Sequence, residues 1–192
     1  MQRLARATRV SWTDSLIALW GVYTALVDGR DCVAVRVPSM LRDDRESLRT
    51  PSAISRAIPV VAGISPYQTV EDVVGVVAGQ LRDSRRHTTV EDHQIARLWP
   101  HGQASYLALP TINIRLFFES MPRLGDVAAV SETISTGPVG SLDLAVYRDP
   151  DSGLRLELST GSTAGDPLRH AERLSASSTP SSTGPRPRPC TS

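Results

Sequence analysis

Hydrophobic and polar residues alternate along several short stretches of the chain, which is the pattern of strands with one buried face. In DCVAVRVP, residues 31–38, the valines at 33, 35 and 37 occupy every second position. Elsewhere the apolar residues recur at helical spacing, as at Val70, Val73, Val74, Val77 and Leu81. Period two predicts a strand and period 3.6 predicts a helix, so the chain combines both kinds of element.

The first strong helix is predicted from its ends as well as from its apolar residues. Ser11 and Asp14 have the spacing of a capping box, an apolar run covers residues 16–27, and Gly29 is a typical stop. The run is too short to cross a bilayer. It predicts a buried helix, covered on more than one side because apolar residues occupy most of its faces.

The other elements follow from the same two periods and from turn residues. In chain order they are a long polar loop over 39–55, a strand over 57–64, a helix from Thr69 to Leu81 with a capping residue at Asp72, a break over 83–89, a short helix over 90–98, and strands over 111–118 and 126–134.

A hairpin ends the predicted sheet. Two alternating runs, at 142–146 and 154–158, flank the segment Asp149-Pro150-Asp151-Ser152-Gly153. Proline presets φ at the first corner, and Gly153 can adopt positive φ. We therefore predict an α/β (α+β) fold in which a mixed sheet has helices packed on one face.

Composition divides the chain into three parts. Residues 1–10 are expected to be a frayed start, residues 11–174 one domain, and residues 175–192, rich in Ser, Thr, Pro and Arg, a disordered tail. The net charge is +1, with 21 arginines scattered along the chain, so nucleic acid and membranes are not expected partners. Cys32 and Cys190 are far apart in sequence, so we expect no disulfide framework and a cytoplasmic location.

Local motifs indicate no self-contained active site. The histidines at 87, 93, 101 and 170 are not paired with a second His or Cys at metal-ligand spacing. The sequence has no nucleophile elbow, phosphate loop or dinucleotide fingerprint. We therefore predict no catalytic residue, no metal and no directly bound cofactor from the residues alone.

Several segments, in the same order and over residues 10–160, resemble a known family. They are VPSMLR at 37–42 against "(L)PVxGR", RTPSAISRAIP at 49–59 against "tPGmxxNxLPlr", LPTINI at 109–114 against "GPtVNi", and STGPV at 135–139 with the following strand against "atGPVdDLxlxVyrd". Together they resemble the C-terminal lobe of nonribosomal peptide synthetase condensation domains, which have two lobes related to chloramphenicol acetyltransferase. Residues 169–174 resemble the start of the closing helix of that lobe.

This resemblance implies one lobe of a CoA-dependent acyltransferase-like fold and a reaction that joins two carrier-bound thioesters. The expected partners are acyl or peptidyl carrier proteins loaded with phosphopantetheine, and a separate N-terminal lobe. The resemblance makes Arg42, Arg45, Arg56 and Asn113 candidates for lining the substrate channel or contacting the carrier.

The departures from the family pattern limit what the chain is expected to do alone. The HHxxxDG motif of the N-terminal lobe is missing from the sequence, Arg56 replaces the family's Asn, and Leu41 replaces the turn Gly. Our first hypothesis is a truncated or split condensation domain, inactive by itself. The alternative is a carrier-protein docking module without catalytic activity, in which the loop over 39–55 contacts the carrier.

Overall fold

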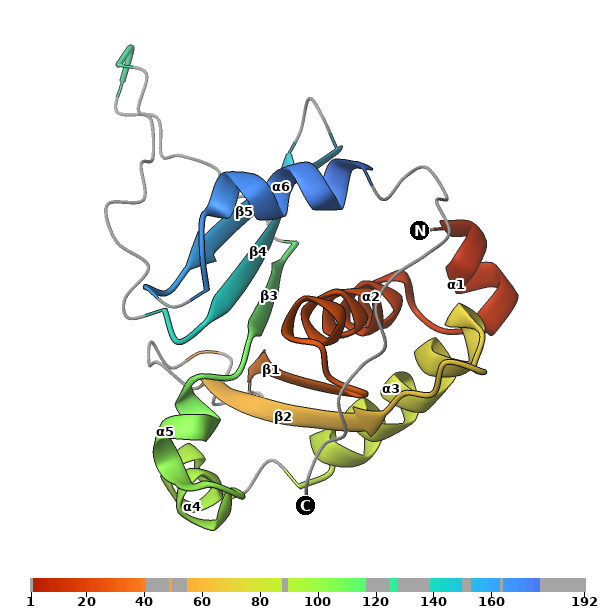
Figure 1. The fold of residues 1–192 in the computed structure, drawn as a ribbon. Coiled ribbons are helices and arrows are strands. Elements are labelled where there is room, and N and C mark those ends of the chain that lie inside the picture. Colours follow the sequence, from red (N-terminus) through yellow and green to blue (C-terminus); the bar gives the residue numbers. More distant parts are fainter. Residues whose placement is uncertain are drawn as a thin grey trace.

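The computed structural model describes residues 2–40, 49, 55–87, 90–116, 125–127, 139–149, 153–162 and 164–176. Its helices are α1 (Gln2–Thr8), α2 (Trp12–Asp28), α3 (Val70–Arg85), α4 (Asp92–Leu98), α5 (Gly102–Leu107) and α6 (Pro167–Ala176). Its strands are β1 (Cys32–Met40), β2 (Ser55–Gly63), β3 (Thr111–Arg115), β4 (Leu142–Asp149) and β5 (Gly153–Thr160). Figure 1 shows their arrangement.

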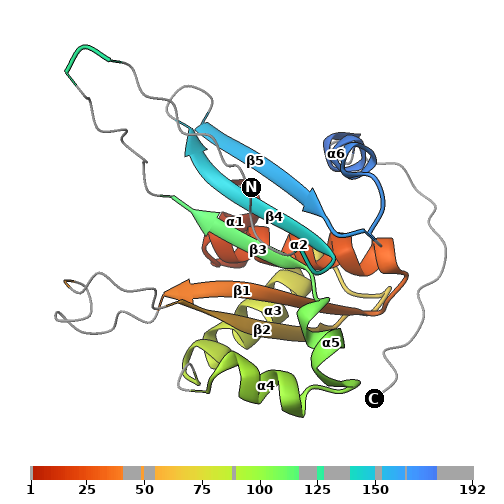
Figure 2. The same cartoon turned by 90° about the vertical axis from the view of Figure 1, so that its left-hand side faces the viewer.

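The strands form one mixed sheet in the order β2-β1-β3-β4-β5. The outer pairs, β1 with β2 and β4 with β5, are antiparallel, whereas β3 runs parallel to both of its neighbours. β3 and β4 pair along five positions, but β1 and β3 pair only at Arg36 and Thr111. Beyond that bridge the two strands diverge (Figure 2), and we call this place the fork.

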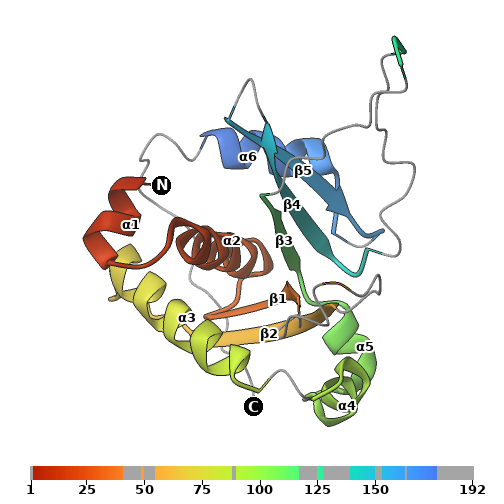
Figure 3. The same cartoon turned by 180° about the vertical axis from the view of Figure 1, so that it is seen from behind.

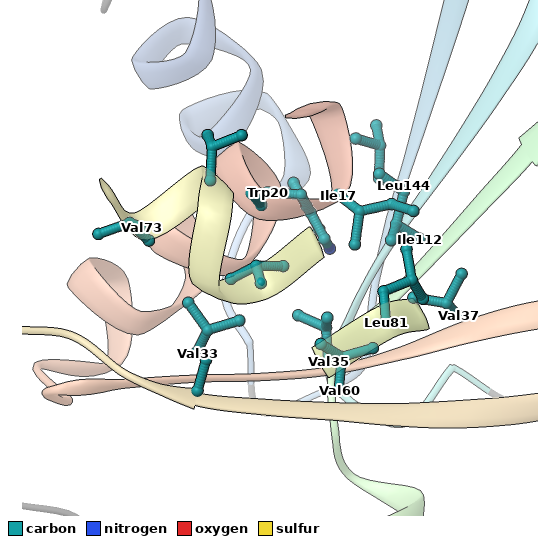
Figure 4. Packing of buried hydrophobic residues seen from close by; sticks show 14 of the residues in the cluster. Ile17, Trp20, Val33, Val35, Val37, Val60, Val73, Leu81, Ile112 and Leu144 are labelled. Carbon is teal, nitrogen blue, oxygen red and sulfur yellow. The ribbon is translucent and has the colours of Figure 1, made fainter. Parts of the chain in front are cut away.

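Helices α2 and α3 cover one face of the sheet, seen from behind in Figure 3. The core between them is made of alternate strand residues and of one side of each helix (Figure 4). Val33, Val35, Val60, Ile112 and Val146 are fully buried in it. The α/β layer and the mixed sheet predicted from the sequence are therefore confirmed.

Two short helices lie on the opposite face. α4 and α5 enclose a small cluster of Ala96, Tyr106 and Leu109, and Ala34 of β1 packs against this cluster. Because Ala34 alternates with Val33 and Val35, its side chain points away from the main core. The sequence did not predict α5, since a helix of six residues is too short for a periodicity to show.

The ends of the long helices agree with their caps. The Ser11 side chain accepts a hydrogen bond from the Asp14 N–H at 3.0 Å, and Gly29 ends α2 with φ of 66°. Thr69 and Asp72 form the complete capping box of α3. α3 continues to Arg85 through part of the predicted break, and Arg82 and Arg85 suit the negative end of a helix dipole.

The hairpin has the predicted register. Leu144 lies opposite Leu158, Val146 lies opposite Leu156, and Gly153 has φ of 87°. Most of the predicted strand over 126–134, most of the loop over 39–55 and nearly all of the predicted tail lie outside the described residues.

Two expectations differ from the structure. Where a frayed start was expected, residues 2–8 form α1, and Leu4 and Val10 pack against the core. Cys32 is disulfide-bonded, so the expectation of a chain without a disulfide is wrong. The cysteines therefore give no support for a particular compartment. No helix of the described part of the chain is long and apolar enough to cross a membrane.

Candidate functional site

The face of the sheet that α2 and α3 leave uncovered carries the polar strand residues. Val35 and Val37 of β1, Ile112 of β3, and Leu142 and Leu144 of β4 all belong to the core. The residues between them must point the other way because side chains alternate along a strand. We call this surface the polar face, and its centre is formed by Arg36, Thr111 and Asp143.

Strand register brings these three residues into one row at the fork. Arg36 is paired with Thr111 across β1 and β3, and Thr111 is paired with Asp143 across β3 and β4. The Arg36 N–H also donates to the Pro110 carbonyl at 2.8 Å, which fixes the start of β3 against β1. The row therefore crosses the sheet at the start of β3, where β1 and β3 begin to separate.

Tyr106 of α5 closes one side of the row. The Arg36 guanidinium lies 5.3 Å from the centre of the Tyr106 ring, within the range of a cation–π contact. The Tyr106 hydroxyl donates to the Ala57 carbonyl at 3.1 Å, which ties α5 to β2. Burial raises the pKa of Tyr106 to about 12, with a further rise from Asp92 and an opposing effect of Arg36, so this phenol is neutral at pH 7.

Asp143 closes the other side. Burial raises the pKa of its carboxyl group, while hydrogen bonds from Thr111 and the charge of Arg36 oppose that rise. Its Oδ1 atom is buried and has no hydrogen-bond partner, and the same is true of Arg36 Nε. A donor and an acceptor are thus left without partners on the same row.

Asn113, a candidate from the sequence, lies on the polar face beyond the row. It follows the buried Ile112 on β3 and is paired with Ala145 of β4. Farther out, the Tyr147 ring lies 5.7 Å from the Arg115 guanidinium and 4.7 Å from that of Arg155. Asn113 is therefore placed between the central row and an outer group of arginine and tyrosine side chains.

Arg155 and Glu157 of β5 form an ion pair at 3.0 Å in this outer group. Both side chains are partly exposed, so the pair is solvated and separate from the central row.

Arg56 lies elsewhere. It lines a cavity of about 360 Å³ between β2, the end of α3 and the start of α4, and its guanidinium is 4.0 Å from the Glu91 carboxylate. On β2 it shares the side of Ile58, which faces the core. The structure thus separates Arg56 from Asn113, and Arg42 and Arg45 lie outside the described residues.

A second cavity, of about 400 Å³, lies between α2, the start of β4 and His170 of α6. His170 is 5% exposed, its Nδ1 lies 2.8 Å from the Tyr23 hydroxyl, and its Nε2 lies 2.8 Å from the Ala164 carbonyl. A carbonyl can only accept, so Nε2 carries a proton and donates to Ala164. The contact of Nδ1 with Tyr23 joins α6 to α2, and the contact of Nε2 ties α6 to the segment that precedes it.

Sequence reasoning placed Asn113 among the candidates but not Arg36, Thr111, Asp143 or Tyr106. One indication was available: in DCVAVRVP the valines fix the buried side of the strand, so Arg36 had to project from the other side. The meeting of Arg36 with Asp143 depends on the strand order, which a periodicity does not determine.

Comparisons with known proteins agree with the motifs noted in the sequence. No protein-family model matches the chain. The chain is 28% identical over 160 residues to a dimodular nonribosomal peptide synthase of Bacillus subtilis (strain 168). The matched region covers 82% of this chain and 7% of that protein. The chain is also 28% identical over 179 residues to enterobactin synthase component F of Escherichia coli (strain K12), covering 90% of this chain and 14% of that protein.

A solved structure supports the same relationship at the level of the fold. The first condensation domain of the CDA synthetase superposes with a TM-score of 0.68 and 23% identity, over 90% of this chain and 39% of that one. The chain therefore has the fold of part of a condensation domain, and its resemblance to nonribosomal peptide synthetases is confirmed. It spans only a small share of the curated relatives and well under half of the solved domain.

Proposed function

We propose that this chain supplies one lobe of a condensation site that joins two carrier-bound acyl groups through an amide or ester bond. The observation that carries the proposal is the similarity to nonribosomal peptide synthetases over 90% of the chain, together with the condensation-domain fold. On this proposal the polar face, with Asn113 between its central row and its outer group of side chains, lines the path of the substrates. The substrates are phosphopantetheine-loaded carrier proteins, and the reaction takes place in the cytoplasm.

The proposed chemistry is attack by an amine on a thioester carbonyl. A C–N bond forms, the C–S bond breaks, and the proton lost by the nitrogen goes to a base and then to the departing thiolate. Such a step needs a group whose pKa lies near neutrality, most often a histidine. Within the described residues the polar face has no imidazole, and Tyr106 stays protonated at pH 7.

The chain therefore positions substrates, and a second lobe supplies the base. This is the truncated or split condensation domain that the sequence led us to expect. The chain alone is inactive on this proposal, because a missing proton acceptor is not replaced by binding a substrate in the right orientation.

The test is a condensation assay with two loaded carrier proteins and product detection by mass spectrometry. The purified chain alone is expected to give no product above background, and addition of an N-terminal lobe carrying HHxxxDG is expected to give turnover. Turnover by the chain alone would contradict the proposal. Carrier binding without turnover in the presence of the lobe would instead indicate the docking module, with Arg42→Ala and Arg45→Ala as the variants that weaken it.

A further inference from the structure

The two unpartnered atoms at the centre of the polar face are of opposite kinds. Arg36 Nε is a hydrogen-bond donor and Asp143 Oδ1 is an acceptor, and each is buried without a partner. Leaving a buried polar atom without a hydrogen-bond partner destabilises the folded protein. Two such atoms in one row of the sheet indicate a site whose hydrogen bonds are completed by another molecule.

The neighbours of the two side chains do not hydrogen-bond to these two atoms. The Arg36 guanidinium lies 5.3 Å from the centre of the Tyr106 ring, a contact that does not give Nε a hydrogen-bond acceptor. Thr111 hydrogen-bonds to Asp143 and is the residue between Asp143 and Arg36 in the register. Neighbouring strands lie about 4.8 Å apart, so a row across three strands is about 10 Å wide at the backbone.

The charges of the row select a class of ligand. A carboxylate would be attracted by Arg36 but repelled by Asp143, and an ammonium group would meet the reverse. A neutral group with a donor next to an acceptor satisfies both atoms without adding a charge. A secondary amide has this arrangement, since its carbonyl can accept from Arg36 Nε while its N–H donates to Asp143 Oδ1.

We propose that Arg36 and Asp143, with Thr111 between them, form a binding site for a secondary amide. The amide lies across β3, at the fork between β1 and β3, with its carbonyl toward β1 and its N–H toward β4. Binding leaves the charge of the site unchanged and supplies a partner to each of the two buried atoms. As a substrate site it rests on the proposed function, because an amide-bearing arm or peptidyl group would be its physiological ligand, but amide binding can be measured without condensation.

The test is an NMR titration of the ¹⁵N-labelled full chain with pantetheine, which contains two secondary amides. The matched probe is a thiol-terminated oligoethylene glycol of similar length, which has no amide. Pantetheine is expected to give saturable shifts at the backbone amides of Arg36, Thr111 and Asp143, whereas the glycol thiol gives none. Equal shifts with both probes, or none with pantetheine, would overturn the site.

One variant removes each of the two hydrogen bonds, and the variant at Arg36 does so without removing its charge. Arg36→Lys keeps the positive charge but removes the Nε donor, and Asp143→Leu removes the acceptor. Each is expected to weaken pantetheine binding roughly tenfold, the usual effect of losing a hydrogen bond to a charged group. Arg86→Met removes an arginine from an exposed pair at the end of α3, away from the polar face, and is expected to leave the affinity unchanged. Wild-type affinity in Arg36→Lys would show that charge alone attracts the ligand and would contradict the proposed geometry.

The fold of each variant is checked by circular dichroism and thermal melting, and the more conservative Asp143→Ala replaces Asp143→Leu if the latter does not fold. Pantetheine binding that persists when no condensation is obtained with the added lobe would support the amide site and count against the proposed function. Condensation whose rate and KM are unchanged by Arg36→Lys would support the proposed function and count against the amide site.

Discussion

The two faces of the sheet are built from neighbouring residues of the same strands, yet they differ in almost every physical property. On the core face Val35 and Ile112 are fully buried among other apolar side chains. On the polar face Arg36 and Thr111, each one position away, meet a phenol and a carboxylate. Neighbouring residues of one strand thus lie in an apolar core on one side of the sheet and among polar side chains on the other.

Polar groups also occur on the core side, but most of them have partners. Ser15 donates to the Ser11 carbonyl at 2.9 Å, Thr24 donates to the Gly21 carbonyl at 3.0 Å, and both nitrogens of His170 are bonded. Trp20 Nε1 is an exception. The polar face instead holds an unpartnered donor and acceptor in one row, which is the expected character of a surface that binds something.

The strongest test of this difference uses two adjacent residues of β3. Ile112→Ala is expected to lower the free energy of unfolding by about 2–5 kcal/mol, because it removes a fully buried side chain and leaves a cavity. Asn113→Ala, on the other face, is expected to change it by less than about 1 kcal/mol. Urea unfolding followed by circular dichroism measures both values.

In a functional assay, by contrast, Asn113→Ala should have a larger effect than its small effect on stability would suggest. In the presence of the complementary lobe, Asn113→Ala is expected to slow condensation under conditions where it remains folded. Similar losses of stability in the two variants would show that the polar face is a second core surface, and the distinction drawn between the faces would fail.

A smaller effect on stability is expected where Gly140 packs against α5. A Cβ atom at Gly140 would overlap the carbonyl oxygen of Leu107, which belongs to α5, the helix that carries Tyr106. Gly140→Ala is therefore expected to destabilise the protein by about 1–3 kcal/mol and to displace α5, because a backbone atom must move.

Gly75→Ala is the matched control for that substitution. Gly75 lies within α3, where an added Cβ meets no atom within 4 Å, and alanine is a better helix former by about 1 kcal/mol. Thermal melting should thus shift downward for the first variant and upward for the second. Shifts in the same direction would contradict the close packing of Gly140 on α5.

The smallest effect is expected in the pH dependence of stability. Burial raises the pKa of Asp143 above its ordinary value of 3.8, so the folded protein holds this proton more tightly than the unfolded chain does. The contribution favours folding at low pH and is lost as the pH rises through the pKa of the folded state. Asp143→Asn does not ionise, and its stability relative to the wild type is therefore expected to increase from pH 4 to pH 7.

Urea unfolding at several pH values measures this difference. Asn113→Ala, which removes no ionisable group, should differ from the wild type by a constant amount over the same range. A relative stability of Asp143→Asn that falls with rising pH would mean that the carboxylate is stabilised in the folded protein by a partner stronger than Thr111 and Arg36.

The elements were predictable from the sequence to the extent that local physics determines them. The capping box at Thr69 and Asp72, the glycine at the end of α2 and the register of the hairpin depend on residues close together in the chain. α5 was missed because a helix of one and a half turns is too short to show a hydrophobic period. α1 was missed because it has few apolar residues and these pack against a core that later segments of the chain form.

The site was predictable only in part. Asn113 became a candidate through a resemblance that rests on a short motif, whereas Arg36 and Asp143 lie in segments whose local patterns indicate strands and nothing more. The relation of Arg36 to Asp143 arises because β3, a distant part of the chain, inserts between β1 and β4. The distance of Arg56 from Asn113 likewise depends on the strand order, which the local pattern does not determine.

The single bridge between β1 and β3 has a consequence for how the protein folds. Arg36 and Thr111 are far apart in the sequence, so forming this contact requires closing a long loop, which has an entropic cost. The strand pairs within the β3–β5 group close shorter loops and therefore have a smaller entropic cost. The hydrogen bonds of a single bridged residue pair offset little of that entropic cost. We therefore expect the sheet to open locally between β1 and β3 at a lower free energy than within the β1–β2 or β4–β5 pairs, with the core residues of α2 packing against both parts.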